Sequence, residues 1–252
     1  MRNAKRIPLL EVCVDSVESA LAAEIGGADR VELCDNLVEG GTTPSLGAIA
    51  VARARLSIKL HVIIRPRGGD FLYSDAEFEV MKSDVKFAKM LGVDGVVIGV
   101  LNADGTVDRE RTRELVEIAR PMSVTFHRAF DMTRDPFEAM ETLVDIGIDR
   151  VLTSGQESVA EKGVELIREL VERASERITI MACGEIREGN VSEVIRGTGV
   201  KEIHATGFVT RESDMQFRNE RVYMGGADLD AEYSIKATSA EKIVALRRAA
   251  EQ

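Results

Sequence analysis

Short apolar runs alternate with amphipathic segments along the whole chain. Eight runs have the length and composition of buried strands, and each leads toward a segment with the apolar spacing of a helix. The eight runs are Leu9–Val14, Asp29–Cys34, Lys59–Pro66, Asp94–Val100, Met122–Phe126, Arg150–Thr153, Arg177–Cys183 and Glu202–Thr206. Eight such units in about 250 residues match the size of one (β/α)8 barrel. We therefore predict an α/β fold, a TIM barrel that forms a single domain over residues 1–252.

Helix starts are marked by a recurring pair of residues. A capping side chain followed three residues later by Glu is the signature of a capping box. The expected caps are Asp15, Ser74, Asp135, Asn190 and Thr238. Pro44 and Pro136 are expected in the first turn of their helices, where proline is favoured.

The main alternative to a barrel is an open, doubly wound sheet. That fold usually carries a Gly-x-Gly-x-x-Gly turn after its first strand, and the chain has none there. The barrel is therefore the better prediction.

One segment, from Phe208 to Ala237, interrupts the alternation with thirty polar, loop-like residues. It carries four of the few aromatic residues, namely Phe208, Phe217, Tyr223 and Tyr233. Long loops in compact domains often act as lids, binding loops or interfaces. We expect this segment to help form a dimer or to cover the site, with a solvated surface excursion as the alternative.

Composition narrows the possible partners. The net charge of -10 argues against a nucleic-acid or anionic-membrane partner. Three cysteines without a Cys-x-x-Cys pair indicate reduced thiols rather than a disulfide framework. No segment resembles a signal peptide or reaches membrane-spanning length. We expect a cytoplasmic protein.

Candidate chemistry begins with two similar runs, in which Glu and Cys lie two residues apart. The pairs are Glu11 with Cys13 and Glu32 with Cys34. Residues i and i+2 of a strand share a face. If the runs form adjacent parallel strands, both thiols lie near the strands' C-terminal ends, with both carboxylates one pleat behind.

Alternation along the strands also assigns an inward face to the rest of the barrel. All histidines and cysteines of the chain fall on it. The inward set is Glu11, Cys13, Glu32, Cys34, His61, Arg65, Thr125, His127, Thr153, Cys183, His204 and Thr206. So many polar residues favour a site at the C-terminal mouth of the barrel.

Structural explanations exist for each of these residues. Cysteine is a common small core residue, and we expect Cys183 to have this structural role. Buried carboxylates need partners, and Arg65, Arg67 and Arg128 are the nearest expected cations. A structural ion-pair network therefore remains an alternative to a functional site.

Anion binding is a second candidate chemistry. Arg65 and Arg67 stand beside two glycines at the end of the third run, while Gly184 and Gly207 follow the seventh and eighth. Arginines and turn glycines at a barrel mouth are typical of phosphate binding. A Schiff-base aldolase, a Gly-x-Ser-x-Gly hydrolase, a P-loop protein and a His-Glu-x-x-His zinc site lack their required residues.

Several blocks of the sequence resemble the CutC family of copper homeostasis proteins. These blocks are Val31-Glu-Leu-Cys34 with Glu39-Gly-Gly, Ile64-Arg-Pro-Arg-Gly-Gly-Asp-Phe71, Thr125-Phe-His-Arg-Ala-Phe-Asp131 and Val151-Leu-Thr-Ser-Gly-Gln156. The resemblance implies a TIM barrel, a cytosolic location, a homodimer or higher homo-oligomer, and a role in copper tolerance. It also implies Cu(I) ligands at Cys13 and Cys34.

Two functional hypotheses therefore stand. In the first, Cys13 and Cys34 hold Cu(I), because soft thiolates suit that ion. In the second, the barrel is an enzyme for a small anionic substrate, such as a phosphorylated one. Arg65 and Arg67 would clamp the anion, and Glu11, Glu32 or His127 would transfer protons.

Overall fold

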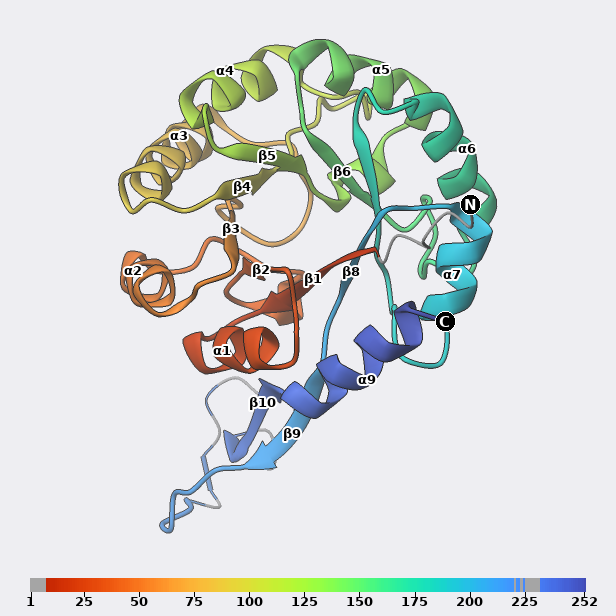
Figure 1. Ribbon diagram of the computed structural model, residues 1–252. Coiled ribbons are helices and arrows are strands. Elements are labelled where there is room, and N and C mark those ends of the chain that lie inside the picture. The colour runs from red at the N-terminus through yellow and green to blue at the C-terminus, as the bar shows by residue number, and fades with distance from the viewer. Residues whose placement is uncertain (1–7, 220, 223, 225–231) are drawn as a thin grey trace.

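Eight parallel strands close into a barrel, with helices around the outside (Figure 1). The computed structural model describes residues 8–219, 221–222, 224 and 232–252. The strands run in sequence order around the barrel, and β8 pairs with β1 to close it. They are β1 (Leu9–Val14), β2 (Arg30–Leu33), β3 (Lys59–Ile63), β4 (Gly95–Ile98), β5 (Ser123–Phe126), β6 (Arg150–Thr153), β7 (Thr179–Ala182) and β8 (Glu202–Ala205). The predicted TIM barrel is confirmed.

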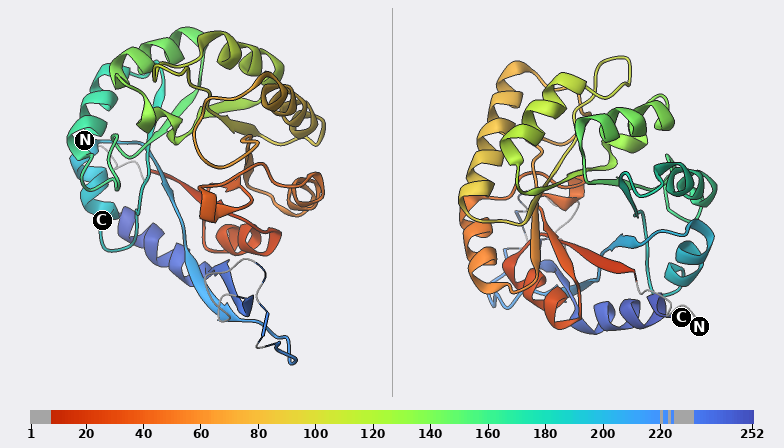
Figure 2. Two further views of the ribbon diagram at one scale, coloured as in Figure 1. Left: turned by 180° about the vertical axis from the view of Figure 1, so that it is seen from behind. Right: turned by 45° about the horizontal axis from the view of Figure 1, so that its top comes forward.

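The helices follow the strands and form the outer layer, as the two views of Figure 2 show. They are α1 (Val17–Ile25), α2 (Leu46–Arg55), α3 (Asp75–Met90), α4 (Arg109–Ala119), α5 (Pro136–Ile146), α6 (Val164–Ala174), α7 (Val191–Thr198) and α9 (Ala240–Ala250). Two short 3-10 turns, η1 (Leu37–Glu39) and η2 (Arg128–Met132), follow β2 and β5. Among the described residues, every helix is too short or too polar to cross a membrane.

Two of the predicted caps are confirmed. Ser74 and Glu77 form a full capping box at α3, and the Asp135 side chain caps α5 with Pro136 in its first turn.

Other predicted helix starts are wrong by one residue. The N-cap residues of α1, α2 and α9 are serines, because each hydroxyl accepts a hydrogen bond from the backbone N–H three residues on. The cap of α1 is therefore Ser16 instead of Asp15, and the cap of α9 is Ser239 instead of Thr238. Pro44 precedes the cap Ser45 and lies outside the first turn of α2. Asn190 precedes α7, but its side-chain oxygen accepts from Arg187 N instead of capping the helix.

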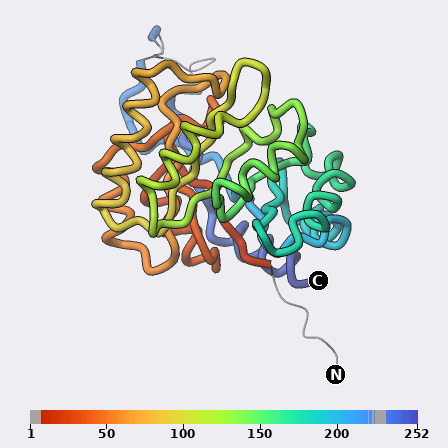
Figure 3. Tube along the Cα trace, turned by 90° about the horizontal axis from the view of Figure 1, so that it is seen from above, coloured from red at the N-terminus to blue at the C-terminus, as the bar shows by residue number. Residues whose placement is uncertain are grey.

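The segment from Phe208 to Ala237 is not a plain loop. Its two ends form an antiparallel hairpin, β9 (Phe208–Glu212) with β10 (Ser234–Thr238). The backbone N–H of Thr238 donates to the Ser19 hydroxyl, which fastens β10 to α1. The described part of the segment projects beyond the ring of helices in Figures 1 and 3. Tyr223, expected to contribute to an interface, lies outside the described residues.

Apolar residues on the outer face of the strands pack under the helices. Val12, Val31, Val62, Phe126 and Ile203 are fully buried there, in the large hydrophobic core between sheet and helices. This layer lets the barrel interior remain polar, because the outer core already buries most of the apolar surface.

The predicted facing of β6 is wrong. Arg150 points into the barrel, where its guanidinium donates to the Thr125 hydroxyl. Alternation then turns Thr153 outward, and its hydroxyl donates to the carboxylate of Asp131. The polar residue that β6 contributes to the interior is therefore its first residue, not its last.

Candidate functional site

An ion-pair network fills the N-terminal part of the barrel interior. The Arg30 guanidinium contacts the carboxylate of Glu11 and lies 2.6 Å from that of Glu202. The Arg150 Nε lies 2.5 Å from the same Oε2 atom of Glu202. Arg30 is thus the cation beside Glu11, and the expectation of Arg65, Arg67 or Arg128 is wrong. The signal was present in the sequence, since Arg30 shares a strand face with Glu32.

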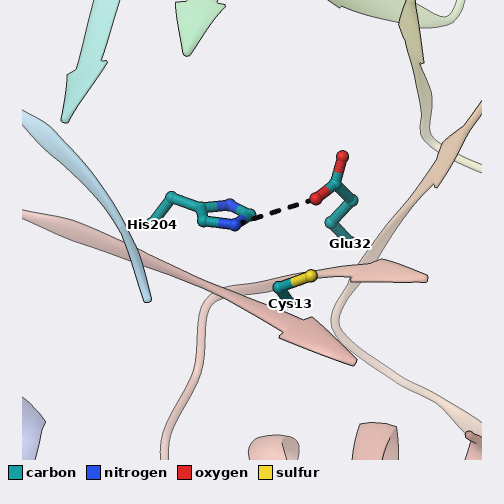
Figure 4. Close-up of side chains that lie close together, drawn as sticks. All are labelled: Cys13, Glu32 and His204. Atoms are coloured by element: carbon teal, nitrogen blue, oxygen red, sulfur yellow. Dashed lines mark ion pairs between the residues drawn. The ribbon is translucent and has the colours of Figure 1, made fainter. Parts of the chain in front are cut away.

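Cys13, Glu32 and His204 converge one layer above this network (Figure 4). Cys13 is the register partner of Glu32 on the neighbouring strand. Ligand atoms of the three side chains lie within 4.8 Å of one another. The Cys34 Sγ lies 3.6 Å from the Cys13 Sγ, so the two predicted thiols do meet.

His204 is held from both sides by carboxylates. Its Nδ1 lies 2.8 Å from Glu11 and its Nε2 lies 3.8 Å from Glu32. Closure of the barrel creates this contact, since β8 must pair with β1 to bring His204 beside Glu11. The sequence placed His204 on the inward face but did not identify it as part of the site.

The electrostatics of this cluster favour one thiolate. A hydrogen bond from Cys34 lowers the pKa of Cys13 to about 6, against the opposing effect of burial. The same contact raises the pKa of Cys34 well above its usual value. Burial raises the pKa of Glu32 to about 8. Although burial opposes it, hydrogen bonds to Cys13 and Glu11 raise the pKa of His204 well above its usual value.

Arg65 and Arg67 follow β3 but have different surroundings. The Arg65 guanidinium is buried and donates to the backbone carbonyls of Glu39, Gly41 and Gly69. Arg67 is partly exposed and forms ion pairs with Asp70 and Glu77. Both arginines therefore hold loops in place, and an anion clamp made of the pair remains a prediction.

His127 caps η2 just after β5. Its Nδ1 accepts a hydrogen bond from the backbone N–H of Ala129, and its ring lies 5.0 Å from that of Phe71. The ring fits because Gly99 directly follows β4 at this point, where an added Cβ would lie 2.3 Å from the imidazole. Burial and the charge of Arg65 lower the pKa of His127 to about 3.

Gly184 and Gly207 each have a packing reason to be glycine. Gly184 has a φ of +98°, and an added Cβ would lie 3.0 Å from the Ser154 side chain. A Cβ at Gly207 would lie 2.5 Å from Ile243 of α9. These contacts explain both residues without an anion, so their role in phosphate binding remains a prediction.

Cys183 lies away from the other thiols. It is buried with Leu152 and Met181 in a small apolar cluster inside the barrel. This placement agrees with the structural role expected for it.

Asp131 is a polar residue whose role was not evident from the sequence. Its carboxylate accepts hydrogen bonds from the loop after β6, including the backbone N–H groups of Ser154 and Gln156, and it pairs with Arg128. It therefore joins the loops after β5 and β6.

Comparison with known proteins agrees with this architecture. The sequence profile of the CutC family matches residues 8–209. A human protein named copper homeostasis protein cutC homolog is 52% identical over 235 residues, which are 93% of this chain and 86% of that protein. A family protein CutC from Mesorhizobium japonicum is 50% identical over 245 residues, 97% of this chain and 95% of that protein.

A solved structure gives the same result. The crystal structure of the putative copper homeostasis protein CutC from Streptococcus agalactiae superposes with a TM-score of 0.76 at 35% identity. It covers 79% of this chain and 98% of the other. Together, the matched profile, the curated relatives and this structure show that the chain belongs to the CutC family.

Proposed function

We propose that the chain binds Cu(I) through Cys13 and Cys34 as part of copper homeostasis. The observation that carries the proposal is the 3.6 Å separation of the two sulfur atoms inside the barrel. Thiolates are the soft ligands that Cu(I) prefers. The names of the curated relatives support copper as the metal.

The separation of the sulfurs also indicates how many ligands the ion would take. With metal–sulfur bonds of about 2.3 Å, a linear two-coordinate site would need roughly 4.6 Å between the sulfurs. A three-coordinate site with a sulfur–metal–sulfur angle of about 120° would need roughly 4.0 Å. The sulfurs lie closer than either value. We therefore expect a third donor rather than a linear pair.

His204 is the best candidate for that third donor. Its imidazole and the Cys13 thiol belong to the same cluster, together with Glu32. Imidazole suits copper better than a carboxylate does. Glu11 would orient the ring through Nδ1, as carboxylates commonly do for metal-binding histidines.

The test is a Cu(I) competition titration against a strong chelator. Cys13→Ser with Cys34→Ser should weaken Cu(I) binding by at least about a hundredfold, because hydroxyls do not replace soft donors. His204→Gln should weaken it by about tenfold. Cys183→Ser is the matched control, since this third buried thiol lies in a separate cluster and should not alter affinity.

Wild-type protein that fails to compete for Cu(I) would remove the metal site. Equal affinity in wild type and the double variant would do the same. Circular dichroism of each variant checks that the barrel is intact.

We also propose a cytoplasmic location, since a thiol site needs a reducing compartment.

We further propose a homodimer or higher homo-oligomer, formed with the β9–β10 hairpin. Its support is the exposure of Met215 and Phe217 beyond β9, at 60% and 77%. Light scattering should give at least twice the mass of one chain, and Phe217→Asp should lower it. A wild-type mass of one chain would refute the assembly.

The alternative function is an enzyme for a small anionic substrate, with Glu11, Glu32 or His127 in proton transfer. It remains a prediction. Glu11 is the least suited of the three, because Arg30 and His204 already occupy its carboxylate.

A further inference from the structure

Arg65 is a buried cation without a carboxylate partner in the described part of the chain. Its side chain is 5% exposed, like the buried arginines of the ion-pair network, yet only backbone carbonyls accept its hydrogen bonds. Carbonyls satisfy the N–H groups but carry no net negative charge. A buried charge that is not neutralised is costly, so its retention calls for an anion.

His127 supplies an unused donor in the same region. Its Nδ1 accepts from Ala129 N, which leaves the ring proton on Nε2. The residue is 5% exposed, and its Nε2 is buried with no hydrogen-bond partner in the described ranges of the chain. An N–H group in this position lacks an acceptor.

Phe71 lies against both residues, and the charge of Arg65 acts on His127. The Arg65 Cζ lies 5.1 Å from the centre of the Phe71 ring, and the His127 ring lies 5.0 Å from it. The Arg65 Nε is also buried without a hydrogen-bond partner among the described residues. Both unpartnered nitrogens, Arg65 Nε and His127 Nε2, can therefore donate a hydrogen bond.

A water molecule could accept these hydrogen bonds but would leave the charge of Arg65 unbalanced. An oxyanion supplies both the acceptor and the charge. Its oxygens accept several hydrogen bonds, and its negative charge pairs with the guanidinium. The three carbonyls hold that guanidinium in one orientation, so its position is already built.

We propose that Arg65 and the Nε2–H of His127 bind the carboxylate or phosphate group of a small molecule beside Phe71. His127 then acts as a neutral hydrogen-bond donor, not as a proton-transfer group. Arg67 holds the loop through Asp70 and Glu77 and does not touch the ligand. Neither cysteine takes part in this site, so the proposal does not depend on copper binding.

The test is calorimetric titration of the full chain with inorganic phosphate and, separately, with acetate, in a buffer free of other oxyanions. Binding of one probe in preference to the other identifies the group. His127→Asn is the decisive variant, because the amide oxygen can still accept from Ala129 N while Nε2–H is lost. It should weaken binding by about tenfold, the usual effect of losing a hydrogen bond to a charged group.

Arg65→Gln should weaken binding more, and if that variant fails to fold, His127→Asn decides alone. Arg134→Gln removes one exposed positive charge and should leave affinity unchanged. The Cys13→Ser, Cys34→Ser variant should also bind the probe normally, which separates this site from copper. Failure of both probes to bind at millimolar concentration, or unchanged affinity in His127→Asn, would overturn the proposal.

Discussion

The barrel interior has a lower part, at the N-terminal ends of the strands, and an upper part, at their C-terminal ends. Buried charged groups are paired in the lower part and incompletely paired in the upper part. In the lower part, Arg30 pairs with the carboxylates of Glu11 and Glu202, and Arg150 pairs with that of Glu202, so each charge has a close partner. In the upper part, among the residues that the structure describes, Arg65 donates only to carbonyls, and His127 Nε2 and Glu32 Oε1 have no partner. Both sets of side chains are buried, so exposure does not explain the difference.

This difference indicates that the lower part stabilises the fold and that the upper part is suited to binding. Paired charges complete the lower interior and need nothing further from solution. Unpartnered groups in the upper part raise the free energy of the folded chain until something binds them. The cysteine pair and the Arg65–His127 pair both lie in this upper part, where active sites of such barrels are found.

The largest expected effect comes from the lower network. Arg30→Met keeps the side-chain volume but leaves Glu11 short of its cation. We expect the free energy of unfolding to fall by about 3–5 kcal/mol, the usual cost of breaking a buried ion pair. Urea denaturation measures the change. The exposed pair Arg177–Glu141 is the control, and Arg177→Met should cost less than about 1 kcal/mol.

If Arg30→Met lowered the free energy of unfolding by less than about 1 kcal/mol, the lower network would contribute little to stability. The contrast between the two parts of the interior would then be wrong.

Acid should destabilise the upper region through His127. Its pKa is lowered to about 3 in the folded chain, mainly by burial, whereas the unfolded chain binds the proton near the ordinary value of 6.5. Stability is therefore lost as the pH falls below about 6.5, by about 2 kcal/mol per such histidine on reaching pH 5.

Urea denaturation at pH 7 and pH 5 measures this loss, and His127→Asn should lose about 2 kcal/mol less than wild type. Groups present in both proteins, including His61 with its similarly lowered pKa, cancel in this difference. An equal loss in the two proteins would contradict a neutral, buried His127.

The smallest effect tests how closely the upper region is packed. Gly99→Ala places a methyl group against the His127 ring and should cost about 1–2 kcal/mol through overpacking. Gly189→Ala meets no atom within 4 Å and should change stability by less than about 0.5 kcal/mol. Equal effects in thermal unfolding would show that the His127 ring moves freely.

Much of the fold could be predicted because local patterns specify it. The apolar runs marked the strands, and a capping box located the start of α3. The meeting of Cys13 with Cys34 was also predictable, because successive strands of such barrels are neighbours and side chains alternate. The Phe208–Ala237 hairpin was missed because its strands are polar and exposed, and therefore lack the apolar pattern of buried strands.

The sequence alone determined which residues face inward on most strands, and therefore that the barrel interior is polar. The tertiary structure decided which of those residues satisfy one another. His204 meets Glu11 across 193 positions of sequence only because the barrel closes, and Arg30 reaches Glu202 by the same closure. Pairing across a closed sheet depends on strand register and on side-chain reach, which alternation along a single strand does not specify.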